Sequence, residues 1–581
     1  MNTGTMWRRA FSFSPRADRP GLGLADLAVG LGTLTLLYVV ARVGAQAFVR
    51  FSPPDFIPSV NLDPRNLPNY TARSTLRMFV ALGFSTLFTF AYGYAAARSK
   101  RAERLLVPLL DILQSVPVLG FLSVTVTAFI ALFRGSLLGL EAASIFAIFT
   151  AQAWNMTFSF YQSLRTVPSE LDEMATLYRL SRWERFTRLE LPVSAIGLVW
   201  NGMMSFGGGW FFLAASEAIS VLNRQYTLPG IGSYVAAAIQ ARDFRALGWA
   251  IIAMIVVILI IDQLFWKPLV TVADRYKLEL SAGESPRSWL VDLWRSASLP
   301  RYAERTVEPI TRALDRWLSA ATAVPTKVRR QTPSRTGTVV YNAILAMVSV
   351  ALLVAAVRFV LSEVGVGELE EAAVLGLATG GRVMVLLLFS TLIWTPIAVA
   401  IGFSPRLARV SQPVVQILAS FPANFFFPFA TIAFIRLGVS LNWGSMLLMA
   451  LGAQWYLLFN VIGGAQSIPN DLREMAASIG LRRSRAWTAL IGPGIFGSWV
   501  TGAITASGGA WNASIVAELV SWGHTTLKAR GLGAYIAEAT AKGDWPRIVL
   551  GVGVMSVFVV ALNRFVWRPL YDLAESKYRL G

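Results

Sequence analysis

Few side chains in this sequence have the types and spacing that enzymatic chemistry requires. The 581 residues include no Cys and a single His, His524. Disulfides, thiolate metal sites and cysteine nucleophiles are therefore excluded, and one His argues against a His-based zinc site or a Ser-His-Asp triad. The sequence also lacks a G-x-x-x-x-G-K-[ST] loop to cradle the phosphates of ATP. We predict no metal site, no catalytic centre and no cofactor held by this chain.

The ionisable side chains that stand out occur as matched pairs at the ends of apolar segments. Arg77 and Arg382 each open one such segment, where a cation can attract anions or reach toward lipid headgroups, and both alternatives stay open. Glu217 and Glu518 lie 24 residues beyond the start of another segment, or ~36 Å along a helix, near the external mouth of a membrane pathway. A carboxylate there suits a gate hydrogen bond or a partner contact better than an anion site.

The composition indicates an integral membrane protein. Hydrophobic residues make up 55% of the chain and charged residues 15%, which is too little charge to cover several water-facing domains. The net charge of +19 is typical of Arg-rich cytoplasmic loops beside anionic lipid, so we expect membrane lipid and not nucleic acid as the partner of these charges.

Twelve apolar stretches are long enough to cross the ~30 Å hydrocarbon core as helices, so the predicted fold is all-α. They lie at residues 24–49, 71–97, 106–133, 140–163, 193–221, 246–269, 337–361, 372–402, 411–437, 443–464, 494–521 and 547–570. Basic residues precede the first stretch, which is too long for a signal peptide, so we expect an uncleaved span with both chain termini in the cytoplasm.

The chain is two copies of one unit. Residues 301 positions apart match along much of each half, as in the pairs Trp154 and Trp455, Pro192 and Pro493, Glu217 and Glu518, and Trp266 and Trp567. Each unit has an even number of spans, so both copies share one orientation and form two parallel six-helix repeats about an axis along the membrane normal. The predicted domains are residues 1–270, a linker at 271–336, and residues 337–581.

The linker combines charge with apolar residues at helical spacing. Aromatic and aliphatic residues recur near Trp289 and Trp294, and again near Ile310 and Trp317. This pattern predicts two short amphipathic helices in the cytoplasmic interface of the membrane. The alternative is a solvated tether that carries these aromatics by chance.

The loop between the fourth and fifth spans has the same design in both copies. Residues 168–192 and 469–493 each open with Pro, followed by Ser169 or Asn470 as a predicted helix cap. Acids then occupy the first turn and apolar residues form a stripe, which predicts a short amphipathic helix held beside the membrane. Such a helix is suited to docking into a partner. The alternative is an interfacial helix that only connects two spans.

These loops resemble the EAA loop of permease subunits of binding-protein-dependent ABC importers. Its matching residues, which the resemblance implies couple to the ATPase, are Glu173, Met174, Ala175, Glu474, Met475, Ala476 and Gly480. Two departures stand out: Arg179 replaces the usual glycine of the first loop, and Gly492 precedes the closing Pro493 where Leu is usual. The tracts at 111–122, 507–518 and 531–536 are similar to the nitrate, sulfonate, taurine and bicarbonate branch.

The resemblance implies a type I ABC importer permease fold and the partners that such a permease requires. These are two copies of an ATPase subunit, which bind ATP and Mg, and a periplasmic or lipid-anchored substrate-binding protein. It also implies a multi-pass location in the bacterial cytoplasmic (inner) membrane.

The fifth span of each copy mixes polar, small and aromatic residues and is the predicted lining of the pathway. The candidates are Asn201, Ser205, Trp210, Thr505, Ser507, Trp511 and Asn512. The glycines among them have close helix packing as an alternative explanation.

The leading functional hypothesis is a fused, non-catalytic permease that imports a small anion or zwitterion, such as nitrate, a sulfonate, taurine or bicarbonate, by alternating access. The alternative is an ion-coupled secondary transporter with two parallel repeats, which needs an intramembrane acid or base. Asp262 has Asn563 as its counterpart, which argues against a paired proton relay. A membrane enzyme is a weaker alternative because clustered His, Cys or paired acids are missing.

Overall fold

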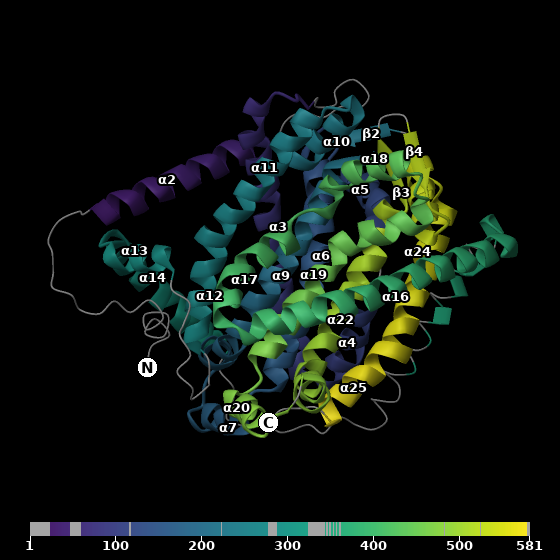
Figure 1. Cartoon of the computed structure of the whole chain (residues 1–581). Helices are drawn as coiled ribbons and strands as arrows, with labels where there is room; N and C mark the ends of the chain where they lie inside the picture. The colour runs from purple at the N-terminus through teal and green to yellow at the C-terminus, as the bar shows by residue number, and fades with distance from the viewer. Residues whose placement is uncertain are drawn as a thin grey trace.

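The computed structural model describes residues 24–46, 60–115, 118–221, 224–276, 288–322, 343, 347, 350–351, 354–355, 357–358, 362–481, 483–522 and 525–577. These residues form a bundle of long helices with small β-hairpins toward one end (Figure 1). The predicted span 337–361 lies largely outside the described residues.

The described residues contain seven helical segments that are long and apolar enough to cross a membrane. They are Leu24–Ala45, Pro64–Arg98, Phe244–Tyr276, Val366–Phe403, Leu441–Gln466, Ser484–Ala517 and Trp545–Ala574. Twelve spans are therefore not confirmed, although the helical, duplicated organisation is.

The first copy contains these elements in chain order: α2 (Leu24–Ala45), η2 (Pro64–Asn66), α3 (Leu67–Arg98), α4 (Lys100–Ser115), η3 (Val118–Phe121), α5 (Leu122–Leu132), α6 (Leu138–Arg165), α7 (Ser169–Leu177), α8 (Arg182–Arg185), η4 (Phe186–Glu190), α9 (Leu191–Glu217), β1 (Ala218–Val221), β2 (Arg224–Thr227), α10 (Ile231–Ala241), α11 (Phe244–Ile261), η5 (Asp262–Trp266), α12 (Lys267–Ala273) and η6 (Asp274–Tyr276). The linker forms α13 (Trp289–Ser296) and α14 (Leu299–Ala321), so its two predicted helices are confirmed as helices.

The second copy repeats this order with α16 (Val366–Phe403), α17 (Pro405–Ser420), η7 (Ala423–Phe425), α18 (Phe427–Leu437), α19 (Leu441–Gln466), α20 (Asn470–Ser478), α21 (Arg483–Ala486), η8 (Trp487–Ile491), α22 (Gly492–Ala517), β3 (Leu519–Trp522), β4 (Thr525–Lys528), α23 (Leu532–Lys542), α24 (Trp545–Leu562), η9 (Asn563–Trp567) and α25 (Arg568–Lys577). Even the irregular π-helical turns recur, since η4 and η5 match η8 and η9 at the same spacing of 301 residues. The predicted duplication therefore holds down to local distortions of the helices.

The predicted third span of each copy is not one helix. In place of 411–437 the structure has α17, the short turn η7 and then α18, and the first copy breaks in the same way between α4 and α5. The break follows from Pro422, because proline disfavours helical backbone at the preceding residue. Phe421 accordingly is extended, with φ −74° and ψ 129°. Pro117 occupies the equivalent place in the first sequence.

The purely helical prediction is also wrong at the end of each fifth span. Helix α9 ends at Glu217 and α22 at Ala517, and each is followed by a two-stranded antiparallel hairpin. The spans 193–221 and 494–521 were predicted to be helical throughout. Their last residues, 218–221 and 519–521, lie in strands instead. Their aromatic and β-branched residues favour strands, as in Leu519–Trp522.

Part of the third segment of each copy packs into the apolar core of the other copy. Val118, Leu119 and Leu122 of the first copy belong to the core cluster of the second. Phe421 and Phe425 of the second copy belong to the core of the first. Each broken third segment thus packs on the fifth helix of the other copy, α9 against α17 and η7, and α22 against η3. This reciprocal packing joins the two halves through their apolar cores.

Candidate functional site

Helices α7 and α20 are the predicted docking helices, and both lie at the end of the molecule opposite the hairpins (Figure 1). Their predicted caps are wrong by one residue. Pro168 and Pro469 occupy the N-cap position with ψ near 137°, and neither helix has a side-chain cap. Ser169 and Asn470 are instead the first helical residues. Each follows the N-cap position, which is the position from which a side chain caps a helix.

Each docking helix presents one face outward. Glu173 and Glu474 are exposed, and so are the apolar side chains of Met174 and Met475, at 51% and 54%. The outward face also includes Tyr178 and Ile479, whereas Ala175 and Ala476 are buried against the protein. We call the exposed set the coupling surfaces. An acid beside large unpartnered apolar side chains is a surface suited to a protein partner.

The turn after each docking helix has the same geometry despite the different residue. Arg179 has φ +50° and Gly480 has φ +62°, both in the left-handed region. Leu180 donates its N–H to the Ala175 carbonyl at 3.1 Å, and Leu481 donates to the Ala476 carbonyl at 3.0 Å. Both helices therefore close with a Schellman-type turn, and the missing glycine strains the first turn without reshaping it.

The two docking helices are fastened to the bundle by different chemistry. In the first copy, Arg185 pairs with Asp172 of α7 and, at 3.0 Å, with Glu190, which also pairs with Arg98 at the end of α3. Glu190 is fully buried. Burial, and then the nearby Arg98 guanidinium, lower the pKa of Arg185.

In the second copy the residue equivalent to Asp172 is Arg473. It donates to the Phe403 carbonyl at 2.9 Å and its guanidinium lies 4.3 Å from the Phe403 ring centroid. Phe403 is the equivalent of Arg98. The same two elements are therefore joined in both copies, by an ionic chain in one and by a cation–π contact in the other.

The far end of α9 contains a buried network that we call the first cluster, formed by Arg73, Ser74, Arg77, Glu141 and Glu217. Arg77 is 3% exposed and Glu217 is fully buried. Arg77 bonds Glu217 through Nη1 at 2.5 Å, and it bonds Glu141 through Nε at 2.5 Å and Nη2 at 2.8 Å. Arg73 also bonds Glu141, at 3.1 Å. Two guanidiniums thus balance two carboxylates.

The second cluster repeats this arrangement with half the charge. Arg382 bonds Glu518 at 2.6 Å, and Thr379 donates to the same carboxylate at 2.9 Å. Asn442 takes the place of Glu141 and binds Arg382 through its carbonyl and side-chain oxygens. The sequence has Ala378 where the first copy has Arg73. The acid Glu141 and the base Arg73 of the first copy are therefore both replaced by uncharged residues in the second. Each cluster stays neutral as a result.

These contacts correct two sequence interpretations. Arg77 does not reach toward headgroups, because its guanidinium is buried and held by two carboxylates. Neither Arg77 nor Arg382 is a free cation for attracting anions, since each is paired with a glutamate. Glu217 and Glu518 make their hydrogen bonds within their own copies, and a gating role for them stays a prediction.

Glycines allow the clusters to form. Gly232 and Gly533, at the start of α10 and α23, donate backbone N–H groups to Glu217 at 2.6 Å and to Glu518 at 2.8 Å. A Cβ atom on Gly230 or Gly531 would overlap the same carboxylates. The carboxylate thus fills the space beside a glycine and joins the end of the fifth helix to the next helix.

The predicted pathway residues of α9 and α22 fall into two groups. Trp210 and Trp511 are buried within their own copies, next to Phe206 and Phe558, so we do not carry them into the pathway. The polar candidates occupy buried or half-buried positions, and they are Asn201, Ser205, Thr505, Ser507 and Asn512. Asn201 donates to the Ser159 hydroxyl, and Thr505 donates to a backbone carbonyl. The Ser205 hydroxyl has no partner among the described residues. Of the polar candidates, Asn512 reaches across the interface and accepts the Val118 N–H at 3.0 Å.

Little open space lies between the copies at the level of these residues. A cavity of about 40 Å³ has walls from both copies, including Gly208, Phe211, Phe421 and Tyr456. A Cβ on Gly208 would overlap the Tyr456 hydroxyl, so close packing accounts for this glycine. The packing of Gly208 against Tyr456 therefore narrows the interface at this level.

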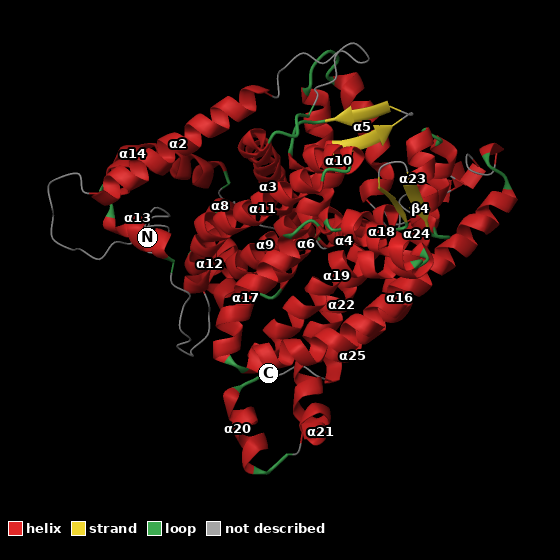
Figure 2. Ribbon diagram, turned by 45° about the horizontal axis from the view of Figure 1, so that its top comes forward, coloured by secondary structure: helices red, strands yellow, loops and turns green. Residues whose placement is uncertain are grey.

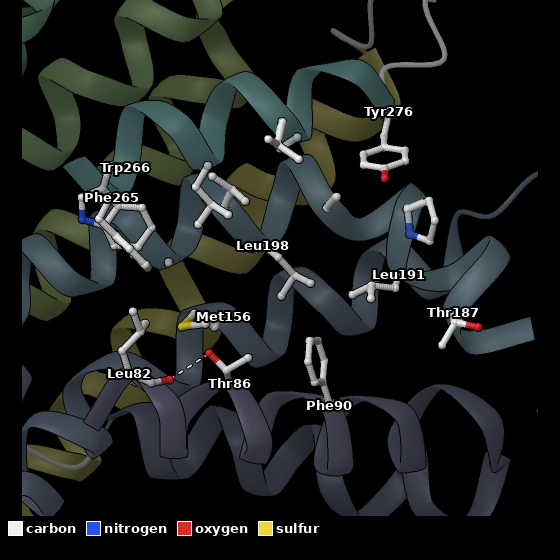
Figure 3. Close-up of a pocket in the computed structure, with 17 residues that line it drawn as sticks. Leu82, Thr86, Phe90, Met156, Thr187, Leu191, Leu198, Phe265, Trp266 and Tyr276 are labelled. Carbon is white, nitrogen blue, oxygen red and sulfur yellow. Dashed lines mark hydrogen bonds between the residues drawn. The ribbon is translucent and has the colours of Figure 1, made fainter. Parts of the chain in front are cut away.

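A larger cavity, of about 240 Å³, lies within the first copy and is lined almost entirely by apolar side chains (Figure 3). Leu82 and Phe90 of α3 face Leu198 of α9 and Trp266 across it. Because all its walls come from one copy, it lies off the interface between the two.

Sequence reasoning missed several residues of these sites. Glu141 and Arg73 of the first cluster were overlooked, although Glu141 is an acid at the edge of a predicted span and such acids usually mark function. Glu190 was overlooked as well, and only its tertiary contacts reveal it.

Comparison with known proteins supports the duplication. The family described as binding-protein-dependent transport system inner membrane component matches residues 89–265 and 393–579, together more than half of the chain. The chain is 23% identical over 182 residues to the taurine transport system permease protein TauC of Escherichia coli (strain K12), which covers 31% of this chain and 62% of TauC.

Two further relatives are similarly distant. The nitrate import permease protein NrtB of Leptolyngbya laminosa is 24% identical over 185 residues, covering 32% of this chain and 63% of NrtB. The bicarbonate transport system permease protein CmpB of Synechococcus elongatus is 24% identical over 177 residues, covering 30% of this chain and 60% of CmpB. In all three cases the chain spans about six tenths of the relative's length.

Proposed function

Because the chain belongs to the family of binding-protein-dependent transport system inner membrane components, we propose that it supplies both halves of the membrane pathway of an ATP-driven importer. It is the permease component of such a system, a non-catalytic subunit that lies in the inner membrane. Its duplication replaces the two separate permease chains that a two-fold pathway otherwise needs.

One observation carries this proposal: in each copy the loop with the coupling surface leads, through a short helix and a π-helical turn, into the fifth helix, whose other end carries a buried Arg–Glu cluster. Helices α9 and α22 have 27 and 26 residues, and 26 residues of α-helix span ~39 Å, enough to cross the hydrocarbon core. Movement of a coupling surface is therefore transmitted along a stiff rod to the opposite face.

The proposed cycle is alternating access. Two ATPase subunits grip α7 and α20, and their closure on ATP draws these helices together and rocks one copy against the other. ATP shifts the pathway in this way only because it binds the closed ATPase pair more tightly than the open pair. The narrow interface beside Gly208 and Tyr456 is then one barrier that this motion opens.

We propose twelve membrane crossings, with the broken segments α4 to α5 and α17 to α18 counted as one crossing each. Helices α6 and α9, of 28 and 27 residues, are long enough to contribute two more in the first copy. With the seven apolar segments this makes eleven, and the twelfth is the predicted span 337–361, which lies largely outside the described residues. Both coupling surfaces then lie in the cytoplasm together with the chain termini.

The solute that we propose is a small anion or zwitterion. The support comes from the relatives, whose names refer to taurine, nitrate and bicarbonate. The polar candidates Asn201, Ser205 and Asn512 are neutral hydrogen-bonding groups, which can pass a small polar solute without binding it tightly. A separate substrate-binding protein then makes most of the selection.

The test is uptake into liposomes that contain the chain, its cognate ATPase and its binding protein. Solute accumulation supports the proposal if it requires all three proteins and ATP on the side of the membrane where the ATPase lies. Accumulation by the chain alone, driven by an ion gradient, would instead establish the secondary transporter. In that case the carboxylates of Glu217 and Glu518 become the first candidates for ion coupling.

A further inference from the structure

The linker helix α14 is fixed at its start to α2, the first helix among the described residues. Asp26 of α2 is buried and accepts the Leu299 backbone N–H at 2.5 Å and the Ser298 hydroxyl at 2.8 Å. A carboxylate from a distant part of the sequence thus binds the free N–H groups at the beginning of α14. Because α2 is an apolar helix of membrane-spanning length, this contact holds the start of α14 beside the bilayer.

The other end of α14 is fixed to the first coupling loop. The Trp183 indole N–H donates to Asp315 at 2.8 Å, and the Trp183 backbone N–H donates to the Thr322 hydroxyl at 3.1 Å. Arg182 donates its N–H to the Thr322 carbonyl at 3.2 Å. Thr322, which directly follows α14, thereby accepts from the first two N–H groups of α8, a helix that begins three residues beyond the turn at Arg179.

The face of α14 opposite Asp315 is apolar and has no protein against it among the described residues. Ile310, Leu314 and Trp317 follow at spacings of four and three, which places them on one side of the helix. They are 68%, 53% and 65% exposed. In Figure 2, α14 and α2 lie together at the edge of the bundle. An exposed apolar stripe of this size requires an occupant.

The occupant that fits is the anionic surface of the cytoplasmic leaflet. The Asp26 bonds place the start of α14 against α2, whose exposed side chains are mostly apolar. Arg305 and Arg316 are exposed on the rest of α14, as is Arg312, which pairs with Glu308. Apolar residues below and arginines beside them are typical of a helix that lies in the membrane interface. Trp317 is also of a type enriched at that depth.

We propose that α14 binds anionic lipid and uses its bonds to Trp183 to hold the first coupling loop in position for the ATPase. The regulatory part of this inference rests on the proposed function, whereas the lipid contact does not. The control is asymmetric, because Ser484 is the equivalent of Trp183 in the second copy and has no indole N–H. Only the first coupling surface responds to the lipid composition.

The lipid contact is tested with single cysteines, which the cysteine-free chain allows without removing native thiols. Ile310→Cys on the stripe and Arg305→Cys on the polar face are spin-labelled in vesicles of phosphatidylcholine alone or with added phosphatidylglycerol. We expect the label at 310 to become accessible to oxygen and shielded from a water-soluble relaxation agent in anionic vesicles, while the label at 305 stays in water. Equal exposure of both labels to water, or shielding at 310 only after the ATPase is added, overturns the lipid proposal.

The link to the coupling loop is tested in the reconstituted complex by the affinity of the ATPase for the permease. Added phosphatidylglycerol should tighten docking of the unaltered chain. Trp183→Phe keeps an aromatic ring but loses the indole N–H, and should reduce the lipid-dependent gain about fivefold, as expected for one hydrogen bond. Asp315→Asn keeps an acceptor oxygen and should retain most of the gain. An unchanged lipid response in Trp183→Phe contradicts the link, while transport itself tests the proposed function separately.

Discussion

Removing one partner from the first cluster should destabilise the protein more than removing the whole pair. In Glu217→Leu, Arg77 loses its 2.5 Å bond, and Ser74 and Gly232 lose their shared acceptor. Arg73 and Arg77 are then left to share Glu141, which leaves one buried positive charge without a partner. Breaking a buried pair in this way costs about 3–5 kcal/mol.

The double substitution Arg77→Met with Glu217→Leu removes both charges and leaves Arg73 and Glu141 as a neutral pair. It should cost less than half of the single change, because apolar residues of similar size often replace a buried ion pair at little cost. In the second copy Glu518→Leu should cost about 1.5–3 kcal/mol, less than in the first. The Arg382 side chain is 11% exposed against 3% for Arg77, so water reaches the unpaired guanidinium more readily.

The assay is the free energy of unfolding of the purified chain in mixed micelles, measured by SDS titration with intrinsic Trp fluorescence. Equal costs for Glu217→Leu and the double substitution would refute the reasoning, because they would mean that the unpaired charge carries no penalty. A larger cost for Glu518→Leu than for Glu217→Leu would refute the comparison between the two clusters.

Two other predictions each compare a substitution with a matched substitution at a second position of the chain. Arg179→Gly should stabilise the protein by about 1 kcal/mol by relieving left-handed strain, whereas Gly480→Ala should destabilise it by about 1–2 kcal/mol; the same SDS titration checks both, and opposite signs would contradict the account of the turn. Gly531→Ala should destabilise the protein by about 2 kcal/mol or more, because its Cβ displaces the Glu518 carboxylate. Gly553→Ala, where a Cβ meets no described atom within 4 Å, should have a neutral or slightly stabilising effect in that assay.

The duplication and the helices α7 and α20 could be predicted because they depend on local sequence. The spacing between equivalent residues, the proline that starts each loop and the exposed acids are all visible without tertiary structure. The structure confirms helices at both places and repeats even the π-helical turns η4 and η8. Local patterns of this kind survive because the same short stretch determines both the element and its exposed face.

The breaks in the third segments were missed for a physical reason. Apolar length alone predicted one helix over 411–437, but Pro422 makes the preceding residue extended and divides the stretch. Proline inside a long apolar run should therefore outweigh the total length in such cases. The hairpins after Glu217 and Ala517 were missed because their apolar residues continue the hydropathy of the span.

The clusters could be predicted only in part, since they join residues that are far apart in the sequence. Arg77 and Glu217 were singled out separately, yet their pairing across 140 positions leaves no local pattern. The paired change of Arg73 and Glu141 to Ala378 and Asn442 is visible in the sequence once the two copies are aligned. Its meaning emerges only when the side chains are seen to balance each other's charge.

The central claim, that both docking helices transmit the work of a separate ATPase, is tested most directly by charge reversal of the coupling surfaces. Glu173→Arg together with Glu474→Arg is compared with Glu363→Arg together with Glu370→Arg, two exposed acids outside the coupling surfaces. The measurement is ATP-dependent uptake in liposomes that contain the ATPase and the binding protein. We predict that the first pair abolishes uptake while the protein remains folded, and that the second pair leaves uptake intact. Unchanged uptake with both coupling glutamates reversed would contradict the claim.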